Sequence, residues 1–186
     1  MTVTFPVVPR GTVITPRLIR VGGDLISTLG GPTQRITRIG SRYAVDVELP
    51  SLDAACAARW LSCPLRAEAQ GDTLGLIMPQ MIDTEHMVPN LGTGAAGSSQ
   101  ITFTATTPSA GMWFSFSAHG RHYLHQITGA DGGSKTASVA PLLRAPMANS
   151  AMEFRAPVLE GFTDDTAWSL EYFRFVGHKF TITESA

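Results

Sequence analysis

Three histidines spaced three residues apart, His119, His122 and His125, are the first residues that could carry chemistry. On a helix, this spacing would bring their imidazole rings to one face, where they could bind a metal ion. The surrounding residues instead indicate a turn followed by a strand, on which side chains three positions apart point to opposite faces. We therefore expect surface or packing histidines, and neither a metal site nor a cofactor.

Asp164 and Asp165 are the second candidate, because two neighbouring carboxylates can serve in acid–base catalysis. They lie in what the sequence predicts to be a polar turn, where aspartate is common. No serine occupies a Gly-x-Ser-x-Gly elbow, and no Gly-Lys-Ser/Thr sequence marks a phosphate-binding loop. The residue patterns therefore predict a protein that is not an enzyme.

Alternating aromatic residues suggest a binding surface near position 113. Phe114 and Phe116 fall on one face of a predicted strand, which we expect to be buried, and Trp113 falls on the other face. An exposed Trp113 could stack on a sugar, as in a carbohydrate-binding module, or contact a neighbouring subunit. A sugar should change its fluorescence in the first case and leave it unchanged in the second.

The composition of the chain favours contacts with other proteins. Of its 186 residues, 44% are hydrophobic and only 16% are charged, and the net charge is −1. Such a weakly charged surface gives no electrostatic support for specific nucleic-acid binding. The sequence has no apolar run long enough to cross a membrane and no signal-peptide pattern, so we expect no membrane insertion and folding in a cytoplasm.

Residues 1–90 predict a β-rich domain that begins with strands. Residues 42–49 alternate between apolar and polar side chains, which is typical of a half-buried strand. Residues 34–39 are its expected antiparallel partner, because Gly40-Ser41 between them suits a two-residue hairpin turn. The pattern therefore predicts a β-hairpin in the middle of this domain.

One helix is predicted in the same domain, from about residue 51 to residue 62. Ser51 or Asp53 could cap its first turn, because a side-chain oxygen there accepts hydrogen bonds from free backbone N–H groups. Pro64 is expected to end it, since a proline disfavours helical conformation in the residue before it. Trp60 lies on the apolar face, which we expect to pack on the hairpin.

The remaining chain is also β in character. Residues 91–99 are rich in glycine and predict a linker or loop between two subdomains. Residues 100–160 contain five short strand candidates, which predict a small antiparallel β-barrel or sandwich. Residues 161–186 are expected to form terminal strands that dock on the first domain or on a neighbouring subunit. The predicted fold is thus mainly β.

The order and spacing of several short motifs resemble those of distal tail proteins and related baseplate hub proteins of siphophages. The motifs are two strand starts, a strand end, one helix and a proline-flanked passage: Gly31 with Gln34, Gly40 with Arg42 and Tyr43, Leu49-Pro50, the helix with Trp60, and residues 140–146. The resemblance covers about residues 29–160, and the segments 12–26 and 161–186 lie outside it.

The resemblance implies a structural virion protein of a long-tailed bacteriophage, assembled in the cytoplasm of the bacterial host. Such a protein forms a homo-oligomeric ring, usually a hexamer, at the distal end of the tail. The ring links the tail tube protein to the hub, tip and receptor-binding parts, and DNA passes through it. A tail tube or tail-completion protein, or a carbohydrate-binding module, is the alternative.

A ring requires that one patch of each copy meets a different patch on the next copy. We expect the hairpin of residues 34–49 and the terminal strand to supply unpaired strand edges for this contact. Replacing Arg42 with glutamate should then impair ring formation. The candidate interface residues are Arg35, Arg38, Arg42, Trp113, His122 and Trp168.

Overall fold

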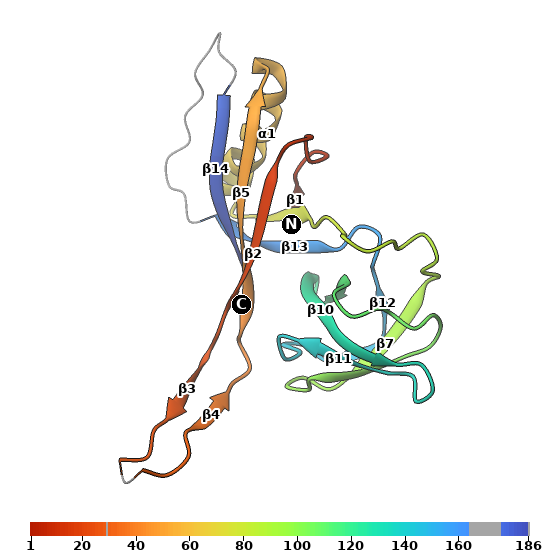
Figure 1. The fold of residues 1–186 in the computed structure, drawn as a ribbon. Helices are drawn as coiled ribbons and strands as arrows, with labels where there is room; N and C mark the ends of the chain where they lie inside the picture. The colour runs from red at the N-terminus through yellow and green to blue at the C-terminus, as the bar shows by residue number, and fades with distance from the viewer. Residues whose placement is uncertain (29, 164–175, 186) are drawn as a thin grey trace.

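The polypeptide folds into two large β-sheets, and a helix packs on the first of them (Figure 1). The computed structural model describes residues 1–28, 30–163 and 176–185. Within these ranges, six strands form each large sheet and two more form a short ribbon. The predicted mainly β fold, a sheet with one helix followed by a small barrel, is confirmed.

The first sheet draws its strands from both ends of the chain. Its strand order is β1-β6-β13-β14-β5-β2; β1 runs parallel to β6, and the other neighbours are antiparallel. The C-terminal strand β14 therefore lies inside this sheet, which is one of the two placements expected for it. The strands are β1 (Thr2–Thr4), β2 (Val13–Ile19), β5 (Arg42–Leu52), β6 (Thr73–Ile77), β13 (Val158–Thr163) and β14 (Val176–Glu184).

The helix α1 (Ala54–Gln70) is longer than predicted. Asp53 caps it as expected, because its side chain accepts a hydrogen bond from the backbone N–H of Cys56 at 2.8 Å. The predicted end at Pro64 is wrong: this proline lies inside the helix with its ring buried, and the chain leaves the helix at Gly71, whose φ is +66°. In the described part of the chain, no helix is long and apolar enough to span a membrane.

Aromatic stacking fixes the helix on the first sheet. Trp60 of α1 stacks on Phe5 with ring centroids 4.9 Å apart, and Phe5 stacks in turn on Phe180 of β14 at 5.4 Å. All three rings are buried, and large aromatic side chains contribute much of the apolar area that a core removes from water. The helix therefore covers one face of the sheet through a continuous aromatic column.

The second sheet curls into a small barrel. Its strand order is β12-β7-β8-β11-β10-β9, and every neighbouring pair is antiparallel. The barrel closes at a single point, where Ser115 and Glu153 exchange backbone hydrogen bonds of 3.0 and 2.8 Å. The strands are β7 (Asn90–Gly94), β8 (Gln100–Phe103), β9 (Trp113–Ala118), β10 (Arg121–Asp131), β11 (Thr136–Ala140) and β12 (Met147–Met152).

The predicted linker at residues 91–99 is wrong in its first half, because this part belongs to β7 in the barrel. Gly92 lies where interior side chains come very close to the backbone. A Cβ atom there would lie 2.5 Å from Met147 Cε and 2.9 Å from Met152 Sδ. The glycine therefore makes room for the packing of two methionines and does not mark a flexible linker.

Beyond the edge of the first sheet, the chain between β2 and β5 forms a projecting two-stranded arm, residues 20–41 (Figure 1). The predicted pairing of residues 34–39 with residues 42–49 is wrong, since β5 pairs with β2 and β4 pairs with β3. At Gly40-Ser41 the chain passes from the arm into the sheet without reversing its direction. The arm strands are β3 (Gly22–Leu25) and β4 (Gln34–Thr37).

The barrel docks on the first sheet through β13. This strand contacts β9 and β10, and the backbone N–H of Val158 donates to Ser115 Oγ at 3.0 Å. Because β13 belongs to the first sheet, the predicted extent of the barrel, residues 100–160, is wrong at both ends: β7 precedes it and β12 ends at Met152. The chain therefore returns to the first sheet after completing the barrel.

Candidate functional site

Two buried carboxylates join the barrel to the first sheet. β10 extends beyond β11, so that residues 121–125 have a strand partner, β9, on one side only. On the other side, the backbone N–H of His122 donates to Glu160 Oε2 at 2.8 Å. Two residues on, the N–H of Leu124 donates to Glu184 Oε1, also at 2.8 Å. The carboxylates therefore take the place of the backbone acceptors that β11 does not provide.

Glu184 lies at the centre of a buried ionic network. Its Oε2 accepts a hydrogen bond from the backbone N–H of Tyr43 at 3.1 Å, and its Oε1 forms an ion pair with Arg144. The Nη1 of Arg144 donates to the carbonyl oxygen of Ser185 at 2.7 Å. Burial raises the pKa of Glu184 to about 7, although Arg144 and the two N–H donors act in the opposite direction. The network thus connects β5, β10 and β14 with the segment after β11.

His125 is enclosed by aromatic rings inside the barrel. Its ring centroid lies 5.7 Å from that of Phe114 and 5.6 Å from that of Phe116. Burial, together with the charge of Arg144, lowers the pKa of His125 to about 3. The imidazole is therefore neutral at physiological pH and packs as a core side chain.

The three histidines do not converge, and the prediction that His122 and His125 face opposite ways is confirmed. His122 lies on the outer side of β10, with its Nδ1 3.1 Å from Ser117 Oγ, whereas His125 points into the barrel. His119 precedes β10 in a turn, with a φ of +53°. Among the described residues, no three side chains of the metal-binding types lie close enough together to hold an ion.

Trp113 is covered by its own chain. It is 8% exposed, and its ring packs edge-on against Tyr43 of the first sheet with centroids 4.9 Å apart. Gln80 holds its backbone, accepting from the Trp113 N–H at 3.1 Å and donating to the Trp113 carbonyl oxygen at 2.5 Å. The residue does lie on the face opposite Phe114, as predicted, but that face is occupied by the first sheet. Trp113 is therefore not available to a sugar or to a neighbouring copy.

The candidate arginines differ in exposure. Arg35 and Arg38 lie exposed on the arm, where Arg35 forms an ion pair with Asp24 on the adjacent strand at 3.1 Å. Arg42 lies at the base of the arm, half-buried, and its charge acts on Glu184. The expectation that residues 42–49 supply an unpaired strand edge is wrong, because β5 lies between β14 and β2. Replacing Arg42 would disturb the buried network, so a loss of assembly in such a variant could not be attributed to an interface.

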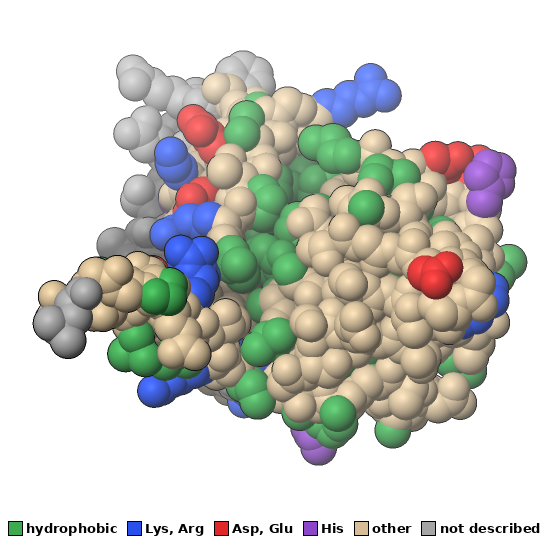
Figure 2. Space-filling model, turned by 60° about the horizontal axis from the view of Figure 1, so that its bottom comes forward, with side chains coloured by type: hydrophobic (Ala, Val, Ile, Leu, Met, Phe, Trp, Pro, Cys, Tyr) green, Lys and Arg blue, Asp and Glu red, His purple; other side chains and the backbone are tan. Residues whose placement is uncertain are grey.

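The arm is both apolar and positively charged on its surface. Residues 13–42 contain five arginines and one aspartate. Figure 2 shows hydrophobic and basic side chains along the arm and the neighbouring flank of the first sheet, beside a largely uncharged barrel face. Exposed apolar side chains together with arginine are enriched in protein interfaces. The exposed large hydrophobic residues of β2 and the arm are Val13, Leu18, Val21, Leu25, Ile26 and Ile39.

The buried network was missed by reasoning from the sequence, although one signal for it was present. Glu184 continues the alternation of Phe180 and Ile182, so a charged residue occupies a position where the pattern calls for an apolar one. Such a residue must find partners in the core, since an unpaired buried charge is costly. The candidates Trp168 and Asp164-Asp165 lie outside the described residues.

Comparison with known proteins does not assign the chain to a family: no protein-family model matches it, and no curated protein sequence matches it either. Its function therefore has to be argued from the arm and from the junction between the two sheets.

Proposed function

We propose that this protein is a structural subunit of the tail of a long-tailed bacteriophage, in which copies assemble into a closed ring at the distal end of the tail tube. The ring, of six copies as the resemblance implies, links the tube protein to the hub and receptor-binding parts. The observation that carries this proposal is the arm, a projecting ribbon whose apolar side chains are uncovered in a single chain.

The exposed apolar side chains of the arm are unfavourable in a protein that remains a monomer. A two-stranded ribbon is marginally stable in water, and its exposed Val21, Leu25 and Ile26 gain nothing from facing solvent. Exposed apolar patches of this kind mark interaction surfaces. When the arm meets a different patch on the next copy, the contact is heterologous, and a rotation that closes produces a ring.

The buried junction supports a linking role. A subunit that connects a tube to a hub has to hold two contact surfaces in a fixed relation. Glu160 and Glu184 bind the barrel strand β10 to the first sheet, and the ion pair with Arg144 reinforces this connection. Breaking the ion pair would leave a buried charge without its partner, which is strongly unfavourable. The arm of the first sheet and the surface of the barrel are therefore held in a fixed relation, as two contact surfaces of one subunit require.

The alternatives predict different assemblies. A tail tube protein would polymerise into long open structures, whereas a distal ring closes at a fixed number of copies. The hypothesis of a carbohydrate-binding module rested on an exposed Trp113, and this tryptophan packs on Tyr43 inside the chain. That hypothesis therefore loses the residue on which it rested.

The proposal is tested by measuring the mass of the purified protein by light scattering after size exclusion, followed by negative-stain imaging. We expect a closed ring whose mass is a fixed multiple of 19.9 kDa. Long filaments would favour a tube protein. A chain that stays monomeric at high concentration, and also in the presence of tail tube protein, would contradict a ring-forming role.

A further inference from the structure

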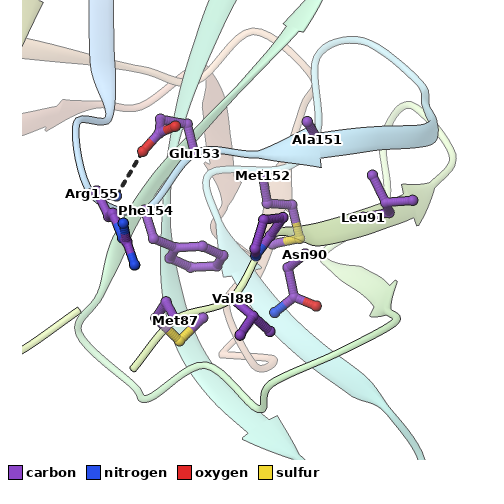
Figure 3. Close-up of a pocket in the computed structure, with 10 residues that line it drawn as sticks. Met87, Val88, Asn90, Leu91, Ala151, Met152, Glu153, Phe154 and Arg155 are labelled. Atoms are coloured by element: carbon purple, nitrogen blue, oxygen red, sulfur yellow. Dashed lines mark hydrogen bonds between the residues drawn. The ribbon is translucent and has the colours of Figure 1, made fainter. Parts of the chain in front are cut away.

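A pocket opens on the barrel between the segment that leads into β7 and the end of β12 (Figure 3). Its cavity measures about 290 Å³. Met87, Met152 and Phe154 form its apolar floor and are themselves buried, while Val88 on the rim is 51% exposed. Methionine side chains adapt to the shape of an inserted group, so this floor can accommodate an aliphatic side chain.

One acidic residue lines the pocket, and two more lie beside it. Glu153 lines it and holds the adjoining turn, accepting from the backbone N–H of Arg155 at 2.8 Å. Glu85 adjoins the pocket, because the Nη2 of Arg155 donates to its carbonyl oxygen at 3.4 Å, and Asp83 accepts from the backbone N–H of Glu85 at 2.8 Å. At and beside the rim, the acidic residues Glu153, Glu85 and Asp83 therefore outnumber Arg155, and His86 lies next to Asp83.

The tip of the arm has the complementary properties. Leu25 is 55% exposed and Ile26 is 76% exposed. Arg20, Arg35 and Arg38 stand behind this apolar tip, with Asp24 as the acidic residue among them. In Figure 1 the tip points away from β7 and β12, so the arm does not cover the pocket of its own chain.

We propose that the arm tip of one copy inserts Leu25 and Ile26 into the pocket of a second copy, with the arm arginines against the acidic residues at and beside the pocket rim. The inference rests on the proposed self-assembly and names the two surfaces that meet. Tip and pocket are different surfaces of one chain, so the contact is heterologous and each copy both gives and receives an arm. The apolar insertion supplies affinity, and the charges set the orientation.

Two single variants test the two halves of the contact. Ile26→Asp places a carboxylate on the tip, and Val88→Arg places a bulky cation on the pocket rim, where it repels the arm. Both positions are exposed, so each variant should fold, which circular dichroism and thermal unfolding verify. We expect each to weaken assembly at least about tenfold, as expected for the loss of an interface anchor. The matched controls Val7→Asp and Met81→Arg, also at exposed apolar positions, should assemble as the wild type does.

Mixing the two variants gives the sharper result. The Ile26→Asp chain keeps an intact pocket and the Val88→Arg chain keeps an intact tip, so the mixture can form one contact and no more. We expect a complex of two subunits by sedimentation, absent from either variant alone. Folded variants that assemble normally, or that form no such complex when mixed, would overturn the inference and leave the ring proposal standing. A wild type that never self-assembles would overturn both.

Discussion

Glu184 and His125 are both buried and both feel the charge of Arg144, and their pKa values are shifted in opposite directions. The pKa of Glu184 rises from 4.5 to about 7, mainly because burial disfavours the carboxylate. The pKa of His125 falls from 6.5 to about 3, because burial and Arg144 disfavour the imidazolium. Each shift therefore contributes its own dependence of stability on pH.

Glu184 has a pKa of 4.5 in the unfolded chain and about 7 in the folded protein. Between these two pH values, the folded protein keeps a proton on Glu184 that the unfolded chain has released. Its contribution to stability is complete below about pH 4.5 and is lost as the pH rises through about 7. Glu184→Gln keeps the side chain neutral at every pH. We expect the free energy of unfolding of this variant to rise relative to wild type by about 2 kcal/mol between about pH 5 and pH 8. Urea denaturation measures it, with the exposed Glu48→Gln as control; a pH-independent difference would contradict the assignment.

For His125 the sign is reversed. In the unfolded chain His125 binds a proton below about pH 6.5, whereas in the folded protein it does so only below about pH 3. The contribution of His125 to stability is therefore complete above about pH 6.5 and is lost as the pH falls toward about 3. His125→Phe removes the titrating group and fits among Phe114 and Phe116. We expect its acid-unfolding midpoint to move to lower pH than that of wild type. The exposed His86→Phe is the control, and an unmoved midpoint for His125→Phe would show that the imidazole does not limit acid stability.

At the scale of elements, the strand β5 and the Asp53 cap could be predicted because their signals are local. Alternation over 42–49 and a capping side chain before a helix need no knowledge of distant residues. The continuation of α1 past Pro64 could not be predicted, because it depends on the burial of this proline in the folded chain, which offsets the backbone hydrogen bond that proline removes. The same holds for β7, because Gly92 makes room for Met147 and Met152, which lie more than fifty residues away in the sequence.

A glycine between two central strands gives a direct test at this scale. A Cβ atom at Gly161 in β13 would lie 2.0 Å from the carbonyl oxygen of Thr183 in β14. Gly161→Ala forces these strands apart, and we expect it to lower the free energy of unfolding by about 2 to 3 kcal/mol. Gly129 in β10 has open space around its Cα, so Gly129→Ala should be neutral or stabilise by up to about 1 kcal/mol. Equal losses in both variants, measured by urea denaturation, would show that β13 and β14 are not packed this closely.

At the scale of the whole molecule, the arm is the feature that sequence patterns could not supply. The strand partners of β5 are β2 and β14, and the chain between β2 and β5 runs out along β3 and back along β4. A local turn signal at Gly40-Ser41 therefore favoured the wrong pairing. Arg35 and Arg38 remain predicted interface residues, chosen because arginines on an expected strand edge suggest an interface, and both are exposed. Glu184 and Arg144 could not be paired from the sequence, because only the packing of the barrel on the sheet brings them together.

Removing the arm separates folding from assembly. Ile19 and Arg42 lie opposite each other where β2 and β5 leave the sheet, so an Asn-Gly turn can replace residues 20–41 and join them as a tight hairpin. Both large sheets and the buried network keep their residues, and we expect cooperative thermal unfolding close to that of wild type. The shortened chain should remain monomeric by light scattering at concentrations where the wild type forms a ring. A ring of unchanged stoichiometry would mean that the edges of the first sheet or the barrel assemble the protein, and the arm would then need a different partner.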